Sequence, residues 1–117
     1  MFWKRRSKYG NRKTEIDGII FSSQREGRRY LELKMKEKAG KIKDLILQPV
    51  YTLQNAFVDN MGNKHRPITY IADFSYFDVD FGKTVVEDAK GMRTELYRLK
   101  KKLFLKQLPE GWVFQEV

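Results

Sequence analysis

The stretch ITYIADFSYFDVDFGKTVVEDAKG, residues 68–91, decides the fold of this chain because it contains its two clearest strands. Apolar and aromatic residues predict strands over Ile68–Phe77 and Thr84–Lys90, joined by a turn at Val79–Gly82. A symmetric hairpin with this turn places Asp73 directly opposite Asp88. Two carboxylates at that separation repel each other unless a cation lies between them, and Mg²⁺ accepts such ligands. A bulge or a shift of register would remove the pairing.

Shorter strands and two helices are expected on either side of this hairpin. The helices are predicted from Ser22-Ser23 to about Ala39 and over about Thr94–Gln107. The second helix carries leucines 96, 99 and 103, which are predicted to face the core. The other predicted strands are Thr14–Ile16 and Ile19–Phe21 around the turn Asp17-Gly18, Leu45–Leu47 and Val50–Leu53 around Pro49, and Trp112–Val117. This alternation indicates an α/β or α+β domain with a small mixed sheet.

Length and composition restrict the class of protein. The 117 residues are enough for one domain, predicted over residues 14–117 after a flexible basic arm at residues 1–13. The absence of cysteine excludes disulfides, thiolate zinc sites and cysteine nucleophiles, and the single histidine, His65, excludes a histidine-rich metal cluster. The chain has no apolar run long enough for a membrane span. No apolar segment follows the basic residues Met1–Arg6, so they do not begin a signal peptide, and we expect a soluble cytoplasmic protein.

The charge is large and unevenly distributed. Lys and Arg number 24 against 15 Asp and Glu, a net charge of +9 that favours a polyanionic partner. The ends of the chain are basic, whereas residues 70–90 form an acidic island. A divalent cation that bridges carboxylates to phosphate would reconcile the two signs. Acids gathered on a solvated hairpin would explain the island equally well.

Three residues could act with the pair Asp73 and Asp88. Lys90 follows Asp88 by two positions, so it shares its face of the strand and could orient an attacking water. Taken alone, this D-x-K spacing is a weak signal, and a surface ion pair explains it as well. Glu26 matches a capping box begun by Ser23, although its helical position also places it at the edge of the sheet-facing stripe. Glu87, the neighbour of Asp88 in the sequence, points to the opposite face of the strand.

Basic residues near both ends of the domain could contact a phosphate backbone. On the second helix they lie on the side away from the leucines, where a charge run is otherwise only a solvated face. The candidates are Arg93, Tyr97, Lys100 and Lys101 on this side, and Arg12 and Lys13 in the arm.

The order of these motifs resembles the PD-(D/E)XK nuclease superfamily. It consists of Glu26 on a helix, Asp73 within ITYIADFSY on one strand, and Asp88 and Lys90 within VVEDAKG on the next. The stretches KYGNRKTEIDGIIFSSQREGRRYLELK and AKGMRTELYRLKKKLF resemble a phage and prophage domain family of that superfamily, often described only as of unknown function. The tail KKKLFLKQLPEGWVFQEV is similar to the end of phage junction-resolving endonucleases, and the resemblance covers roughly residues 8–117.

This resemblance implies a restriction-endonuclease-like core and a metal-dependent site. Asp73 and Asp88 would bind Mg²⁺, with Mn²⁺ as a substitute, and Glu26 would complete the site. The carbonyl of Ala89 would be a further ligand, and Lys90 would position the water. Two departures from the signature are Ala72 where it has proline, and an aspartate at position 88 where glutamate is commoner. A bulge would exchange the roles of Asp88 and its neighbour Glu87.

The function expected from these residues is that of a Mg²⁺-dependent endodeoxyribonuclease. Its favoured substrate is branched DNA such as a Holliday junction, cut during phage recombination in the host cytoplasm. A homodimer is expected, because two paired sites are needed to cut a junction. These expectations rest on analogy with the enzymes that the chain resembles. The alternative is a non-catalytic DNA-binding module of a phage recombination or packaging complex. A nuclease directed at RNA is a third reading, because ribose preference depends on contacts to the 2′-hydroxyl.

Overall fold

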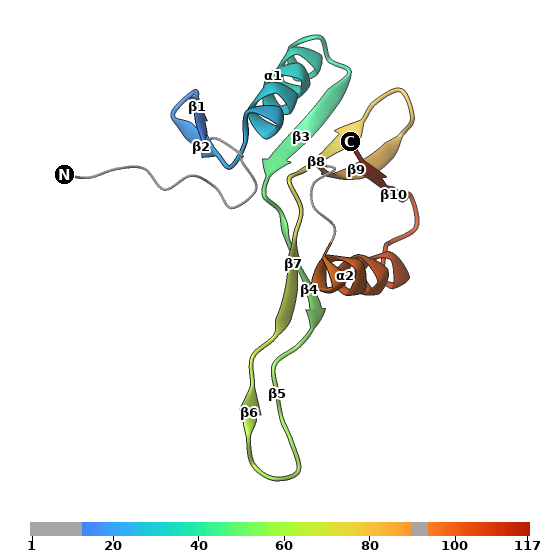
Figure 1. The fold of residues 1–117 in the computed structure, drawn as a ribbon. Coiled ribbons are helices and arrows are strands. Elements are labelled where there is room, and N and C mark those ends of the chain that lie inside the picture. Colours follow the sequence, from blue (N-terminus) through green and yellow to red (C-terminus); the bar gives the residue numbers. More distant parts are fainter. Residues whose placement is uncertain (1–12, 90–93) are drawn as a thin grey trace, which may run out of the picture.

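The computed structural model describes residues 13–89 and 94–117, and these form an α+β fold (Figure 1). Its centre is a four-stranded mixed sheet of order β10-β9-β8-β3, in which only β10 and β9 run parallel. The strands β1–β2, β4–β7 and β5–β6 form separate two-stranded ribbons. The elements are β1 (Thr14–Ile16), β2 (Ile19–Phe21), α1 (Gln24–Lys38), β3 (Ile42–Leu47), β4 (Val50–Gln54), β5 (Phe57–Val58), β6 (Lys64–His65), β7 (Ile68–Ile71), β8 (Phe74–Asp78), β9 (Lys83–Asp88), α2 (Glu95–Lys106) and β10 (Trp112–Glu116).

The N-terminal hairpin and α1 form as the sequence predicts. Asp17 and Gly18 have φ angles of 54° and 77°, the left-handed pair that a two-residue hairpin turn requires. The Ser23 side chain caps α1 by accepting a hydrogen bond from the amide of Glu26. The hairpin packs closely on the helix, since a Cβ added at Gly27 would lie 2.9 Å from Ile16 Cδ1. The start of α1 is therefore fixed by local turns and by contact with β1.

The predicted strand Ile68–Phe77 is divided into β7 and β8, which is a correction to the sequence analysis. β7 pairs with β4, whereas β8 pairs with β3 on one side and β9 on the other. The chain changes partners at Ala72 and Asp73, and the alternation of faces changes there too. Tyr70 and Ala72 pack in one hydrophobic cluster, and Phe74 packs in the other, although the alternation of a single continuous strand would place all three on one face.

The β8–β9 hairpin confirms the predicted pairing of the two strands. Its register runs from Asp78 opposite Lys83 to Phe74 opposite Glu87 without a shift. The amide of Asp73 donates to the carbonyl of Glu87 at 3.0 Å, one residue out of this register, which indicates a bulge where β8 begins. Asp73 is therefore not paired with Asp88 in the ladder, although the two side chains still meet at the end of β9.

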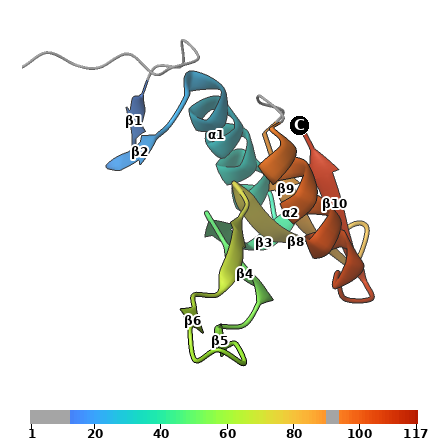
Figure 2. The same ribbon diagram turned by 60° about the horizontal axis from the view of Figure 1, so that its bottom comes forward.

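Two hydrophobic clusters lie on opposite faces of β9, one under each helix. Val85 belongs to the cluster with Tyr30 and Leu33 of α1, whereas Val86 belongs to the cluster with Phe104 of α2. Figure 2 separates the two helices, with β9 between them. Successive residues of β9 therefore point alternately toward α1 and toward α2, which determines the surroundings of Glu87 and Asp88.

Helix α2 is rotated relative to the prediction. Its one fully buried residue is Phe104, whereas Leu96, Leu99 and Leu103 are 60%, 55% and 37% exposed. The prediction that the leucines face the core was wrong. The face of α2 that carries Phe104 is buried instead, because three aromatic rings of the sheet and of the β4–β7 ribbon surround this side chain. The ring centroids lie 4.7 Å away at Tyr51, 5.2 Å at Tyr70 and 5.9 Å at Phe114. Neither helix of the described residues is long and apolar enough to span a membrane.

Candidate functional site

Asp73 and Asp88 form a carboxyl pair at the end of the β8–β9 hairpin. The two carboxyl groups are hydrogen-bonded to each other, Asp73 also accepts from the amide of Ala89, and Asp88 accepts from the hydroxyl of Tyr70. Burial raises the pKa of Asp73 to about 7, with a further increase from the charge of Asp88. Burial also raises the pKa of Asp88. Such a contact between two acids requires a shared proton or another positive charge between them.

The donors of this pair suit a divalent cation. Hard oxygen ligands are available from both carboxylates, and the carbonyl of Ala89 follows Asp88 directly in the chain. Within residues 13–89 and 94–117, no three Asp, Glu or His side chains converge closely enough to hold a metal. An ion at this pair would therefore complete its coordination with water or phosphate oxygens, as Mg²⁺ commonly does.

Glu26 lies near the pair but is held by other groups. Its side chain is buried and accepts from the hydroxyl of Ser22 at 2.7 Å and from the side chain of Gln48. Burial is the main cause that raises its pKa, and the charge of Asp73 adds to the increase. The Ser23 half of the predicted capping box is present. Glu26 thus faces Asp73 without joining it in a three-acid cluster.

A cavity of about 180 Å³ opens between α1 and the end of the sheet. Glu26, Asp73 and Ala89 line it, whereas Asp88 does not, because Asp88 points toward α2. Three arginines of α1, at positions 25, 28 and 29, line it as well. Acidic and basic groups therefore line one small opening, an arrangement suited to a cation and an anion together.

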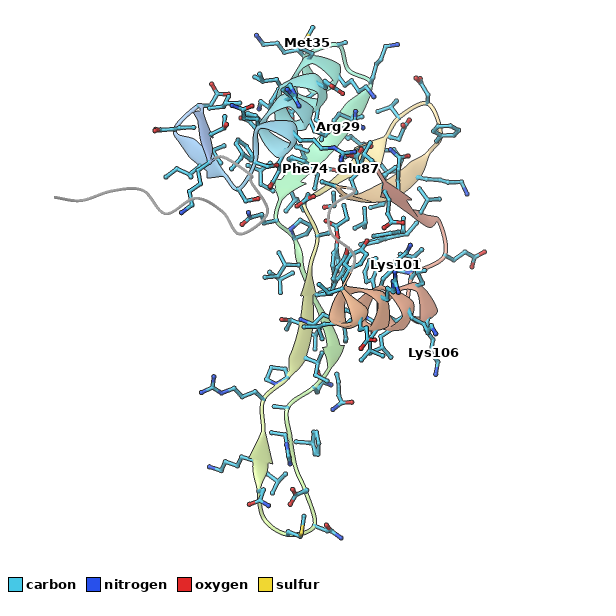
Figure 3. The ribbon with its side chains drawn as sticks, viewed as in Figure 1. Arg29, Met35, Phe74, Glu87, Lys101 and Lys106 are labelled. Atoms are coloured by element: carbon cyan, nitrogen blue, oxygen red, sulfur yellow. The ribbon has the colours of Figure 1, made fainter. Side chains whose placement is uncertain are left out.

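Glu87, the neighbour of Asp88, is part of the core. Its carboxylate is fully buried and accepts two hydrogen bonds from Arg29, at 2.8 and 2.5 Å, and one from the hydroxyl of Tyr76 (Figure 3). This bidentate contact raises the pKa of Arg29. Both oxygens of Glu87 are therefore engaged on the α1 side. The geometry favours Asp88 over Glu87 as the metal-facing acid.

The expected phosphate track on α2 is directed inward. The Tyr97 hydroxyl and Lys101 Nζ each donate to Glu116 of β10 at 2.7 Å, and Lys101 lies over the ring of Phe114 (Figure 3). Lys100 is half-buried. The side of α2 opposite the leucines thus faces the sheet, which corrects the prediction that it faces solvent. Lys13 is exposed, and the other candidates, Arg12, Lys90 and Arg93, lie outside the described residues.

Sequence reasoning missed three residues near the pair. Arg28 could have been found, because positions 25, 28 and 29 follow helical spacing beside Glu26. Tyr70 could not, since its contact with Asp88 depends on the change of strand partner at Asp73. Glu116 lies opposite Asp88 only through the parallel pairing of β10 with β9, and no local pattern encodes that pairing.

Comparison with known families identifies the chain. Residues 6–117 match the family described as "Protein of unknown function (DUF1064)", and the chain belongs to this family. The match spans Glu26, Asp73, Asp88 and Lys90, so a single family domain contains every predicted catalytic residue. No curated protein and no solved structure matches the chain.

Proposed function

We propose that this member of the DUF1064 family is a Mg²⁺-dependent endodeoxyribonuclease of the PD-(D/E)XK type. The observation that carries the proposal is the contact of Asp73 with Asp88 beside the cavity that is lined by both acidic and basic side chains. A net charge of +9 supports a nucleic acid as the substrate. Cleavage of DNA that requires Mg²⁺ and stops with EDTA tests this activity.

The side chains around the pair have distinct roles in this proposal. Asp73, Asp88 and the carbonyl of Ala89 would hold Mg²⁺, which supplies charge neutralisation at the phosphate and makes a bound water more acidic. Glu26 keeps the cavity polar, since it accepts from Ser22 and its charge interacts with that of Asp73. Lys90 is assigned to the positioning of the attacking water by its place in the D-x-K motif.

Metal binding can be measured without activity, through thermal unfolding. At a concentration tenfold above its Kd, Mg²⁺ should stabilise the protein by about 1.4 kcal/mol, or about 5 °C in Tm. Asp73→Asn should remove this increase, while it raises the Tm in EDTA because the repulsion within the pair is gone. The matched control is Asp80→Asn, which removes an exposed acid in the β8–β9 turn and should retain the increase. An equal Mg²⁺ effect in both variants would contradict the proposed site.

The second candidate is a non-catalytic DNA-binding module of a phage recombination or packaging complex. It is favoured by the same contact, because a shared proton alone can hold Asp73 against Asp88. The two candidates differ in their response to metal. A protein that binds DNA with no Tm change in Mg²⁺ or Mn²⁺ and no cleavage would be the binding module.

For the substrate we propose branched DNA, cut by a homodimer that supplies one site for each strand. The supporting surface is the leucine stripe, defined as Leu96, Leu99 and Leu103 on the exposed face of α2. Their i, i+3, i+7 spacing is that of a helix-pairing seam. In an antiparallel pair related by a two-fold axis, Glu95 of one copy would approach Lys102 of the other, so the charges beside the seam are complementary.

Replacing Leu99 tests the dimer. Leu99→Glu buries a charge in the proposed seam and should raise the dimer Kd at least about tenfold in light-scattering measurements. The chain has no cysteine, so Leu99→Cys can also be joined by a short thiol crosslinker without background. Leu31→Cys is the control, because Leu31 is an exposed leucine of α1 at 44%. A monomeric wild-type protein, or equal crosslinking of both cysteine variants, would overturn the seam.

A further inference from the structure

The arginines that line the cavity differ in their partners. Arg29 is bonded to Glu87 and Glu32, and Arg25 donates to the carbonyl of Val117. Arg28 is exposed and has neither a hydrogen bond nor an ion pair with any residue of the described chain, although it lines the same cavity as Glu26 and Asp73. One guanidinium group therefore remains available at the mouth of the cavity.

The acids of the cavity are already satisfied without Arg28. Glu87 and Glu32 accept from Arg29, and Glu26 accepts from Ser22. Asp73 contacts Ala89 and Asp88. The carboxylates near Arg28 are therefore already hydrogen-bonded to other groups, whereas the five N–H donors of Arg28 are bonded to none of the described residues. Its planar donors suit a phosphate oxygen pair better than any other common anion in a nucleic acid.

We infer that the cavity receives one phosphate group of the DNA backbone, contacted by Arg28, and that the bound strand crosses the N-terminal half of α1. This inference rests on the proposed function for the identity of the anion. The phosphate would lie in the cavity that Arg28 and Asp73 both line, where a cation at the carboxyl pair balances its charge.

The alternative track on α2 is poorly placed for this task. Tyr97 and Lys101 are bound to Glu116, and the leucine stripe occupies part of the exposed side of α2. No residue of α2 lines the cavity beside Asp73. A strand that follows α2 would therefore not present its phosphate to Asp73, whereas a strand across α1 would.

The test compares equal charge losses on the two helices. The binding of a fluorescently labelled four-way junction is measured in EDTA over a series of salt concentrations, so cleavage cannot interfere. Arg28→Gln should weaken binding several-fold and reduce the slope of log K against log salt by about 0.9, the value for one lost phosphate contact. Lys106→Gln removes one exposed charge from α2, outside the proposed seam, and should change the affinity less than about twofold, with its slope unchanged.

The outcomes separate this inference from the proposed function. A slope lowered by Lys100→Gln with Lys101→Gln, and not by Arg28→Gln, would place the backbone on α2 and overturn the inference. Equal effects of Arg28→Gln and Lys106→Gln would also overturn it, because they indicate general charge attraction alone. If Arg28→Gln alone lowers the slope while wild-type protein cleaves no DNA in Mg²⁺ or Mn²⁺, the inference that DNA crosses α1 is supported and the nuclease proposal fails. Unchanged Tm values for both variants confirm that folding is not the cause.

Discussion

Replacing Asp88 with asparagine is expected to lower metal-dependent DNA cleavage at least about 100-fold, while DNA binding is kept or strengthened. A metal ion at a phosphate contributes several kcal/mol to transition-state stabilisation, and each 1.36 kcal/mol is a factor of about ten in rate. The substitution removes one negative charge from the carboxyl pair itself, so repulsion of the DNA backbone decreases. Single-turnover cleavage and equilibrium binding, measured on the same preparation, check the two halves of this prediction.

Two results would contradict this expectation. Retained cleavage in Asp88→Asn would exclude Asp88 as a metal ligand. Loss of cleavage in Asp80→Asn as well would indicate a general effect of charge, since Asp80 is exposed in the turn between β8 and β9. The asparagine is close in size to the native side chain and can still accept from the hydroxyl of Tyr70, so unfolding is not the expected cause.

Replacing Glu87 with glutamine is expected to destabilise the fold by about 3 kcal/mol. Loss of one partner from a buried ion pair typically costs about 3–5 kcal/mol, and the lower end applies because Arg29 is partly exposed. The corresponding decrease in Tm is about 12 °C. Urea unfolding gives the free energy directly, provided that the m value is unchanged.

A double-mutant cycle isolates the ion pair from other effects. Arg29→Gln alone should also be destabilising, because it leaves the fully buried Glu87 with Tyr76 as its remaining partner. The double variant should lose less stability than the sum of the single variants. Strictly additive losses would show that Arg29 and Glu87 do not depend on each other. A stable Glu87→Gln protein that no longer cleaves DNA would transfer the catalytic role from Asp88 to Glu87.

The two acids show how strand geometry separates fold from proposed function. Glu87 and Asp88 are adjacent in sequence, yet one points toward α1 and the other toward α2. On the α1 side Arg29 holds Glu87, whose side chain is fully buried, so the acid there stabilises the core. The end of β9 provides Asp73 and Tyr70, so the acid there joins a carboxyl pair with raised pKa values.

Local signals predicted the turns, the helix boundaries and the proximity of Asp73 to Asp88. The Asp17-Gly18 turn has the left-handed angles that its sequence requires, and α2 begins after Thr94, which caps it. The proximity followed from the spacing of the two acids around a short turn, and the register is continuous from that turn to Phe74 and Glu87. In each case the deciding interaction lies within a few residues or one hairpin.

Features that depend on distant contacts could not be read from the pattern. The division of the strand at Asp73 arises because β4 and β9 pair with successive parts of it. The orientation of α2 depends on the rings of Tyr51 and Tyr70, which together outweigh three leucines. The cavity results from α1 lying over the sheet end, so the role inferred for Arg28 required the structure.

The most direct test of the central claim is a cleavage assay in Mg²⁺ and in EDTA, with Asp88→Asn in parallel. The substrates are a four-way junction, a flap, a linear duplex and single-stranded DNA. We expect Mg²⁺-dependent cutting of the junction in preference to the linear substrates, with no cutting in EDTA or by Asp88→Asn. A folded protein that binds the junction but cuts no substrate in Mg²⁺ or Mn²⁺ would contradict the nuclease proposal.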